Sequence, residues 1–456
     1  MARNQLIQVR RDTTANWGNV NPTPAEGEHC YDINTGYFRI GTGVTPYSQL
    51  PVFTPGATIA DVVGVEWDTA SSSPTLKRID INGNELSGLT PEYFNNHRLW
   101  RSLGRCTIDP ATNIPIYGTN ARGDGLDLTG SSGNVMVGIP SFYAKFALVG
   151  TYIRFWVSPV PQPGFELFPC FVQRGGTEAA LFIGAYESSG FLDGGTFKTQ
   201  SASGKQPVTG AVAYTNLPNT GRLTIADAET YSNNIGAGYG EVNIWAIAAA
   251  RLLYLIEYAT WDSQTAIGKG IVDLPIGTDF AGKLTGADSA NTNISTNGTG
   301  TGTGVNGQTP VVYRGIENLW GNTHTWVIGV NFYDTVHRII KADGTGTMAA
   351  VLAAGSYDES ASAPPNTTTA ANGYISSIFT DTPLKYLMLG AATAGSSSTY
   401  LCDQYYIRAA SATPTCLLFG GYWFNGLAAG VGGLSSFYGA ARSSRNYGAR
   451  LEFLKR

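Results

Sequence analysis

The sequence predicts an α+β fold that is rich in β-structure and carries one or two helices. Only 14% of the 456 residues are charged, and the chain holds 57 glycines beside many aromatic residues. This mixture is typical of β- and loop-rich structural or binding proteins rather than of disordered chains. The third observation is one long apolar segment with helical spacing, residues 241–261. The length suffices for roughly two to four domains.

We expect three regions. Residues 1–55 form a small N-terminal β module, residues 56–140 an irregular β-rich intermediate region, and residues 141–456 the main domain. A Pro-, Gly- and Thr-containing connector at 51–60 separates the first region from the second. A low-complexity insertion near residues 288–309, rich in Thr-Gly repeats, is expected to form a flexible surface loop.

The N-terminal module is predicted to contain a hairpin. Asn34-Thr35-Gly36 lies between two β-prone runs at 31–33 and 37–40, and residues 6–11 alternate as in a further strand. Such a small unit is marginal by itself, so self-association is expected. A monomeric cap on the next domain is the alternative.

Several elements of the main domain are predicted by local patterns. Alternating apolar residues predict strands that run to Pro140 and across 181–186, and further strands are expected at 384–390, 403–408 and within 417–450. Thr224 with Asp227 three residues later is a capping-box pattern that starts a short helix. The longer helix across 241–261 is apolar on more than one stripe, so both of its sides should be buried.

Charge and hydropathy exclude several function classes. The net charge of −4 provides no basic footprint for nucleic acid. The sequence contains no run of about 18 apolar residues, so no membrane insertion is expected, and the N-terminus has no secretory h-region. Five scattered cysteines without a CxxC pattern predict neither a disulfide framework nor zinc; Cys402 with Cys416 could bridge, but buried free thiols are expected. The chain suits a protein made in the cytoplasm and released by lysis.

The C-terminal stretch, residues 418–456, mixes large aromatic residues with Gly, Ala and Ser. Tyr422, Phe424, Gly426 and Ala428 are two apart, so they share one face if the segment is extended. Binding surfaces favour this mixture, because Tyr buries much area at a low entropic cost. A Gly-rich buried strand with aromatic residues in the core is the alternative.

The same stretch resembles the C-terminus of the phage major tropism determinant family at 419–421 (FGG), Trp423 and 448–450 (GAR). Members of that family are receptor-binding proteins with a C-type lectin fold, in which a reverse-transcriptase system diversifies chosen codons. Trp320-Gly321-Asn322 and Trp326 also resemble the core of formylglycine-generating-enzyme-like lectin folds. Residues 7–43 resemble a module of phage tail fibres that trimerises and joins the virion.

The resemblance implies a set of receptor-binding positions. Trp423, Gly420, Gly421 and Arg450 would be scaffold residues. All the types at the implied positions can arise from randomised adenines in an asparagine-type codon, which cannot produce Lys, Glu, Gln, Met or Trp. The implied positions are Tyr422, Phe424, Gly426, Ala428, Ser435, Phe437, Tyr438, Arg442, Ser444, Asn446 and Tyr447.

No catalytic site, metal site or cofactor is expected. Cys402 and Cys416 do not match the cysteine pair of the formylglycine-generating enzymes, and no nucleophile with a base and an orienting group is evident. The triplets with which C-type lectins bind calcium are missing from the sequence. Glu187 is expected to be structural, and His324 by itself is no metal centre, because zinc needs three or four ligands.

The leading hypothesis is a phage tail-fibre or tail-tip protein, homotrimeric, that binds a host-cell surface receptor, either glycan or protein. It would be assembled in the host cytoplasm and reside in the virion tail with other tail proteins. The alternative is a structural decoration or baseplate component without receptor contact. A fibre-borne glycan hydrolase would require two carboxylates about 5–10 Å apart in a cleft.

Overall fold

The computed structural model divides the chain into two units, Met1–Val62 and Val63–Arg456, and each is rich in β-structure, as the predicted α+β class requires. Each unit is described by itself. The residues that the structure describes are 9–33, 38–50, 61–173, 180–210, 222–274, 294–346, 348–353, 355–360, 371–382, 384–409 and 413–454.

The first unit is a three-stranded sheet with one short helix. Strand β1 (Val9–Asp12) pairs in parallel with β2 (His29–Asp32), and β2 pairs antiparallel with β3 (Phe38–Ile40). The predicted hairpin strands are therefore confirmed, while the predicted turn at 34–36 lies outside the described residues. Trp17, Cys30 and Tyr47 form a small core, in which the Trp17 and Tyr47 rings stack 4.2 Å apart.

Helix α1 (Thr14–Val20) in this unit has no counterpart among the sequence predictions. It begins at Thr13, whose side chain accepts a hydrogen bond from the Asn16 N–H. Trp17 is its one buried residue, so the helix carries no apolar periodicity that a sequence pattern could reveal.

A six-stranded sheet joins the beginning and the end of the larger unit. Its last strand, β29, lies between β15 and β12, so the chain's end pairs antiparallel with both. The strands predicted up to Pro140 and from 181 are confirmed as β8 and β12. In spatial order the sheet contains β15 (Tyr239–Glu241), β29 (Leu451–Leu454), β12 (Ala180–Gly184), β8 (Asn134–Pro140), β6 (Gly104–Ile108) and β7 (Pro115–Tyr117).

A five-stranded sheet combines strands from both sides of residue 140. Strand β10 pairs with β9 on one side and with β4 on the other. Strands β4 and β10 also contact a helix that is described below. Residues 63–140 thus share sheets and a core with residues after 140. In order the sheet contains β11 (Glu166–Leu167), β9 (Tyr143–Val149), β10 (Tyr152–Ser158), β4 (Val63–Asp68) and β5 (Lys77–Ile79).

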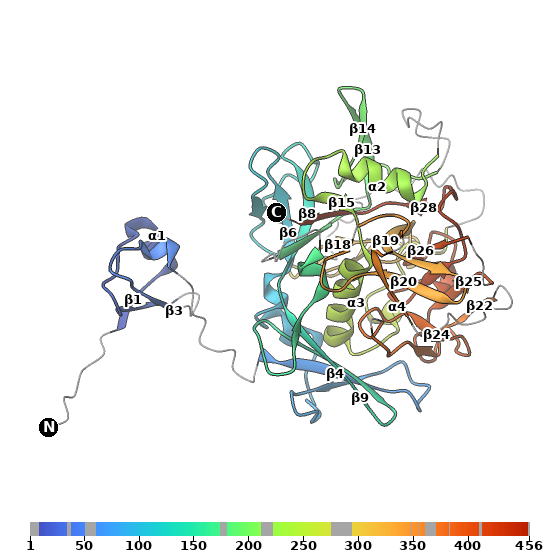
Figure 1. Ribbon diagram of the computed structural model, residues 1–456, viewed down its shortest axis with the longest axis horizontal. Coiled ribbons are helices and arrows are strands. Elements are labelled where there is room, and N and C mark those ends of the chain that lie inside the picture. Colours follow the sequence, from blue (N-terminus) through green and yellow to red (C-terminus); the bar gives the residue numbers. More distant parts are fainter. Residues whose placement is uncertain are drawn as a thin grey trace. The chain divides into compact units, whose positions relative to one another are not determined.

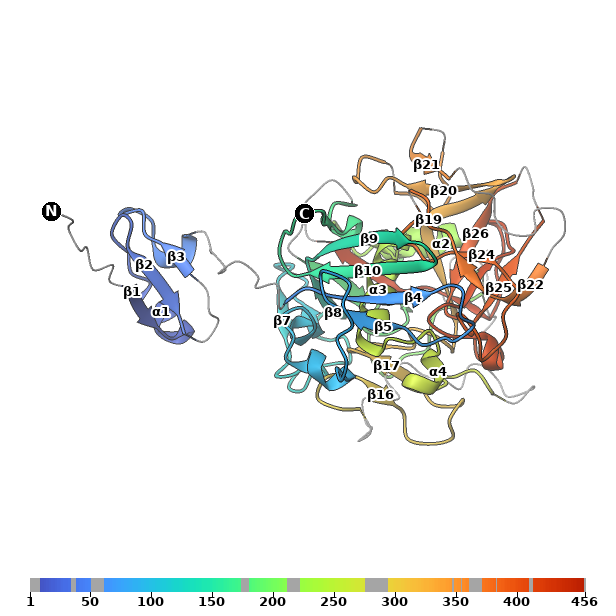
Figure 2. The ribbon, with the colours of Figure 1, turned by 90° about the horizontal axis from the view of Figure 1, so that it is seen from below.

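Helix α3 (Ile244–Tyr258) is the centre of the larger unit. Asn243 begins it by accepting from the N–H groups of Trp245 and Ala246, and Ala259 ends it in the left-handed region at φ 51°. Every residue from Ile244 to Glu257 is buried, as the apolar pattern across 241–261 predicted. The helix contacts β4 and β10 of the five-stranded sheet and β19 of the sheet described next (Figure 2).

The largest sheet lies between α3 and α2 (Ile225–Asn233), so the unit is layered (Figure 1). Thr224 and Asp227 form the predicted capping box at the start of α2. The strand expected at 403–408 is confirmed as β25. The sheet contains β21 (Tyr357–Glu359), β20 (Val336–Ile340), β19 (His324–Tyr333), β26 (Thr415–Phe419), β27 (Leu434–Ser436), β25 and β22 (Ala371–Tyr374), with β28 (Tyr447–Gly448) on β19; β25 spans Gln404–Ile407.

The remaining elements are short. Hairpin β13 (Ser189–Asp193) and β14 (Thr196–Gln200) projects beside α2 (Figure 1), and α4 (Ser263–Ala266) follows α3. Strands β23 (Ser377–Ile378) and β24 (Gly390–Ala392) form a separate pair. The strand expected at 384–390 is wrong, because residues 384–387 form a turn in which Leu387 N–H donates to Leu384.

The expectation of a flexible loop is also wrong for the described part of the low-complexity insertion. There β16 (Gly300–Thr301) pairs with β17 (Val311–Tyr313), which pairs with β18 (Ile316–Glu317). Thr299 is buried and its hydroxyl accepts from the Arg314 N–H at 3.1 Å. Tertiary hydrogen bonds therefore order a segment whose composition cannot form a core of its own.

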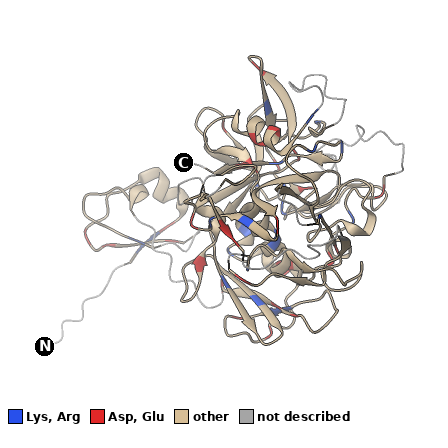
Figure 3. Ribbon diagram, turned by 45° about the vertical axis from the view of Figure 1, so that its right-hand side comes forward, with Lys and Arg blue, Asp and Glu red and all other residues tan. Residues whose placement is uncertain are grey.

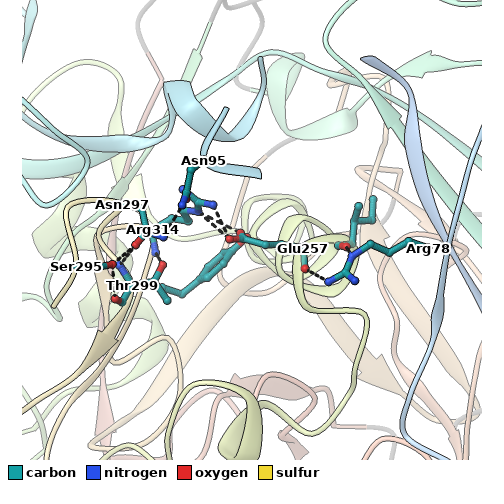
Figure 4. Close-up of polar contacts among 9 residues, drawn as sticks. Arg78, Asn95, Glu257, Ser295, Asn297, Thr299 and Arg314 are labelled. Atoms are coloured by element: carbon teal, nitrogen blue, oxygen red, sulfur yellow. Dashed lines mark hydrogen bonds and ion pairs between the residues drawn. The ribbon is translucent and has the colours of Figure 1, made fainter. Parts of the chain in front are cut away.

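Charged residues are sparse along the ribbon (Figure 3), and several of them are buried. Glu257 on α3 and Arg314 form an ion pair of 2.5 Å that is almost fully buried on both sides. The Tyr313 hydroxyl donates to the same carboxylate at 2.9 Å, and Arg78 donates to the Ile256 and Glu257 carbonyls at the C-terminal end of α3 (Figure 4). A cation there also suits the helix dipole. This network ties β5, α3 and β17 together.

Breaking this buried pair should destabilise the larger unit strongly. Arg314→Met leaves the Glu257 carboxylate buried without its counter-ion, so we expect a loss of about 3–5 kcal/mol in the free energy of unfolding, measured by urea denaturation. Lys77→Met serves as the control, because its pair with Glu85 is exposed and spans 3.8 Å. An unchanged urea midpoint for Arg314→Met would contradict the assigned role.

Candidate functional site

The C-terminal residues singled out by the sequence lie in two segments beside the largest sheet, the turn at 422–428 and the stretch 435–447. Phe419, Leu434 and Tyr405 point to the main core around α3, whereas Trp326, Leu418 and Tyr447 belong to a separate cluster that includes α2. Side chains alternate across a sheet, so this second cluster marks its other face. The segment 437–449 covers that face beside α2, whereas the turn at 422–431 packs against residues 263–274.

The segment after β26 is a compact turn rather than an extended strand. Gly420 and Gly421 have φ of 90° and 82°, and a Cβ on Gly421 would lie 2.4 Å from the Ala429 Cβ. The Tyr422 N–H donates to Asn425 Oδ1 at 2.8 Å, and residues Gly426–Ala428 form a 3-10 turn. The expectation that Tyr422, Phe424, Gly426 and Ala428 share one strand face is therefore wrong, because the chain reverses within these residues.

The turn exposes some aromatic residues and buries others. Phe424 is 47% exposed and Tyr422 is half-buried, whereas Trp423 is only 4% exposed. Trp423 Nε1 donates to Asn446 Oδ1 at 3.1 Å, and the Arg445 guanidinium lies 5.3 Å from the Trp423 ring. Trp423 thus links this turn to the segment before β28, which agrees with the scaffold role implied for it.

A chain of ring contacts connects the two halves of the candidate site. The His324 ring lies 5.3 Å from that of Tyr422 and 6.2 Å from that of Tyr447. Tyr447 lies 5.5 Å from Tyr438, and the Arg442 guanidinium lies 5.0 Å from the Tyr438 ring. Burial raises the pKa of Tyr447, and a hydrogen bond with Tyr438 raises it further. These five residues form the aromatic cluster.

Beside the aromatic cluster lies a groove of about 780 Å³. One side is the segment after β27, from Phe437 to Arg442. The other side comes from distant parts of the chain: Arg408 after β25, Thr413 and Pro414 before β26, and Val351. We call this the C-terminal groove.

The implied positions differ in their exposure. Phe424 and Arg442 are exposed; Tyr422, Gly426, Ala428, Phe437, Tyr438, Ser444 and Asn446 are partly buried. Ser435 and Tyr447 are buried, at 3% and 4% exposure. Ser435 lies in β27, in register with Leu418 and Tyr406, so it is part of the sheet beneath the surface.

Some residues of the site were not found from the sequence. The sequence assigned His324 no role in binding, yet its ring lies between those of Tyr422 and Tyr447. Gln264 on α4 donates to the carbonyls of Gly426 and Ala429, at 2.9 and 2.7 Å, and so fixes the exposed turn. No pattern near Gln264 or Arg408 signals this, because their partners are distant in sequence.

The carboxylates around the site serve the backbone. In a smaller pocket of about 230 Å³, Asp403 accepts from the Gly432 N–H at 2.7 Å and Asp262 accepts from the Thr265 N–H at 3.0 Å. Buried Glu187 accepts from Asn318 at 3.1 Å and from the Thr323 N–H at 3.0 Å, the structural role expected for it. Within the described ranges, no three His, Cys, Asp or Glu side chains gather as metal ligands.

All five cysteines are buried free thiols, as expected. None of the helices in the described part of the chain is both long and apolar enough to span a bilayer.

Comparison with known proteins finds a family similarity in the first unit. Residues 7–45 match the family model described as the major tropism determinant N-terminal domain. No curated protein sequence matches the chain.

The chain is also similar to solved major tropism determinants along most of its length. It matches the P3c variant at 12% identity, covering 98% of this chain and 100% of that one, with a TM-score of 0.25. The M1 variant gives 12% identity, 98% coverage of both chains and a TM-score of 0.26. The C-type lectin fold of the larger unit stays a prediction from the sequence resemblance.

The histidine at the centre of the aromatic cluster should make stability depend on pH. Burial lowers the pKa of His324 to about 4, against about 6.5 in an unfolded chain. As the pH falls from 6.5 towards 4, His324 binds a proton in the unfolded state but not in the folded state. The folded protein therefore loses stability across this pH range. His324→Gln keeps an acceptor for the Gly421 N–H.

We expect His324→Gln to lose about 2 kcal/mol less stability than the wild type between pH 7.5 and pH 5, as measured by urea unfolding at both values. Parallel pH dependence of the two proteins would show that His324 does not titrate in this way.

Proposed function

We propose that this protein is a phage tail-fibre or tail-tip protein that binds a host-cell surface receptor through the C-terminal surface of its larger unit. Its N-terminal domain attaches it to the virion and assembles it as a homotrimer. The N-terminal family match supports the virion role, and the small three-stranded sheet with a core of three residues suits a unit that gains stability by association.

The observation that carries receptor binding is the aromatic cluster. Tyr422 comes from the turn after β26, whereas Tyr438 and Arg442 come from the segment after β27, and ring contacts through His324 and Tyr447 connect the two. Phe424 extends the first turn into solvent. Tyr and Arg are the residues on which binding surfaces most often depend, because each combines a large contact area with hydrogen bonding.

Binding would be multivalent. A trimer carries three such surfaces and a particle carries several trimers, so sites of modest individual affinity hold the particle firmly. The receptor surface would therefore tolerate single weak contacts, and variation at exposed positions such as Phe424 would shift the receptor choice without abolishing attachment.

The test removes two rings of the aromatic cluster. Tyr422→Ala with Tyr438→Ala should abolish binding of the full-length protein to susceptible cells, measured by flow cytometry. The matched control, Tyr93→Ala with Tyr152→Ala, deletes two exposed tyrosines from other surfaces and should bind as the wild type does. Undiminished binding by the first pair at an unchanged melting temperature would instead favour a structural decoration of the virion.

A further inference from the structure

The C-terminal groove carries positive charge, which indicates the class of ligand that it can bind. This inference rests on the proposed receptor-binding function. Arg408 and Arg442 line it and both are exposed. Its described lining contains no Asp or Glu, and neither arginine forms an ion pair with a described carboxylate. An arginine stays charged at every physiological pH. The groove therefore presents positive charge that the described carboxylates do not neutralise.

The two arginines differ in how they are held. The Arg442 guanidinium lies 5.0 Å from the Tyr438 ring, which restricts its orientation. Arg408 directly follows β25, which pairs with β27 in the largest sheet, so that sheet fixes the backbone of Arg408. A guanidinium that is already oriented loses less entropy when it forms the paired hydrogen bonds that carboxylates and phosphates accept.

The rest of the lining suits a carbon skeleton rather than an ion alone. Phe437 and Tyr438 provide aromatic surface, with rings 5.0 Å apart, and Val351 and Pro414 face them from the other side. Small residues at 439–441 leave room between these walls. A volume of about 780 Å³ falls within the usual range of small-ligand sites, roughly 300–1,000 Å³, whereas a folded protein partner needs a broad surface instead.

We propose that the C-terminal groove binds an anionic saccharide of the host surface, with the carboxylate or phosphate on Arg408 and Arg442 and the sugar rings on Phe437 and Tyr438. Carboxylated and phosphorylated sugars share this chemistry. Arg408 lies outside the positions implied by the family resemblance. A variant at Arg408 therefore tests the groove separately from receptor binding in general.

The experiment measures binding of the full-length protein to immobilised polygalacturonate, phosphomannan, neutral dextran and polyglutamate at 50 and 500 mM NaCl. We expect binding to at least one of the two anionic saccharides, about tenfold weaker at high salt. Arg408→Gln should weaken that binding about tenfold. Arg101→Gln should not, because Arg101 is also exposed and does not line the groove.

Binding to neither anionic saccharide, equal binding to dextran, or an unchanged Arg408→Gln variant would overturn the proposal. Binding to polyglutamate that depends on Arg408 and equals saccharide binding would also overturn it, in favour of an acidic peptide. If Arg408→Gln leaves cell binding intact while the Tyr422 and Tyr438 double variant loses it, the proposed function stands and this inference falls. Melting temperatures establish that each variant is folded.

Discussion

The larger unit depends on the way in which one buried guanidinium holds the end of the chain. Arg450 donates to the carbonyls of Gly184, Glu317 and Asn318 at 2.7–3.0 Å, and it is 1% exposed. An isolated buried cation is costly, but carbonyl oxygens that are already in place satisfy this one. Strand β29 then pairs with β12 and β15, so the last strand is held between two strands from much earlier in the chain.

The segment between β26 and β29, residues 420–450, is consequently fixed at both ends by strands that are paired in sheets. Backbone contacts fix its intermediate points: Arg251 donates to the Val431 carbonyl at 2.8 Å, and Asp403 accepts from the Gly432 N–H. A Cβ on Gly430 would lie 2.2 Å from Asp403 Oδ1, so only glycine fits there. Because these anchors act on the backbone, side chains that face solvent, such as Phe424, can change while the loops keep their course.

That freedom does not extend to every implied position. The Tyr447 ring lies 5.3 Å from the Trp326 ring and is buried, and Ser435 is enclosed in the largest sheet. Substitutions at these two positions alter packing as well as any contact with a receptor, since buried volume changes are costly. The surface therefore combines exposed positions that can vary freely with buried ones that also determine how the loops sit.

The sequence by itself determined the β-rich class, the buried helix across 241–261, the capping box at Thr224 and the N-terminal hairpin, because each depends on periodicity or on contacts a few residues apart. Only the tertiary structure decided the reversal at 422–428, where glycines at positive φ and the Asn425 side chain replace an extended strand. It also decided the groove and the position of His324, because Arg408, Gln264 and His324 meet the C-terminal loops only through strands paired across long stretches of chain. Contacts of that kind leave no local pattern, since their geometry is set by sheet register and not by neighbouring residues.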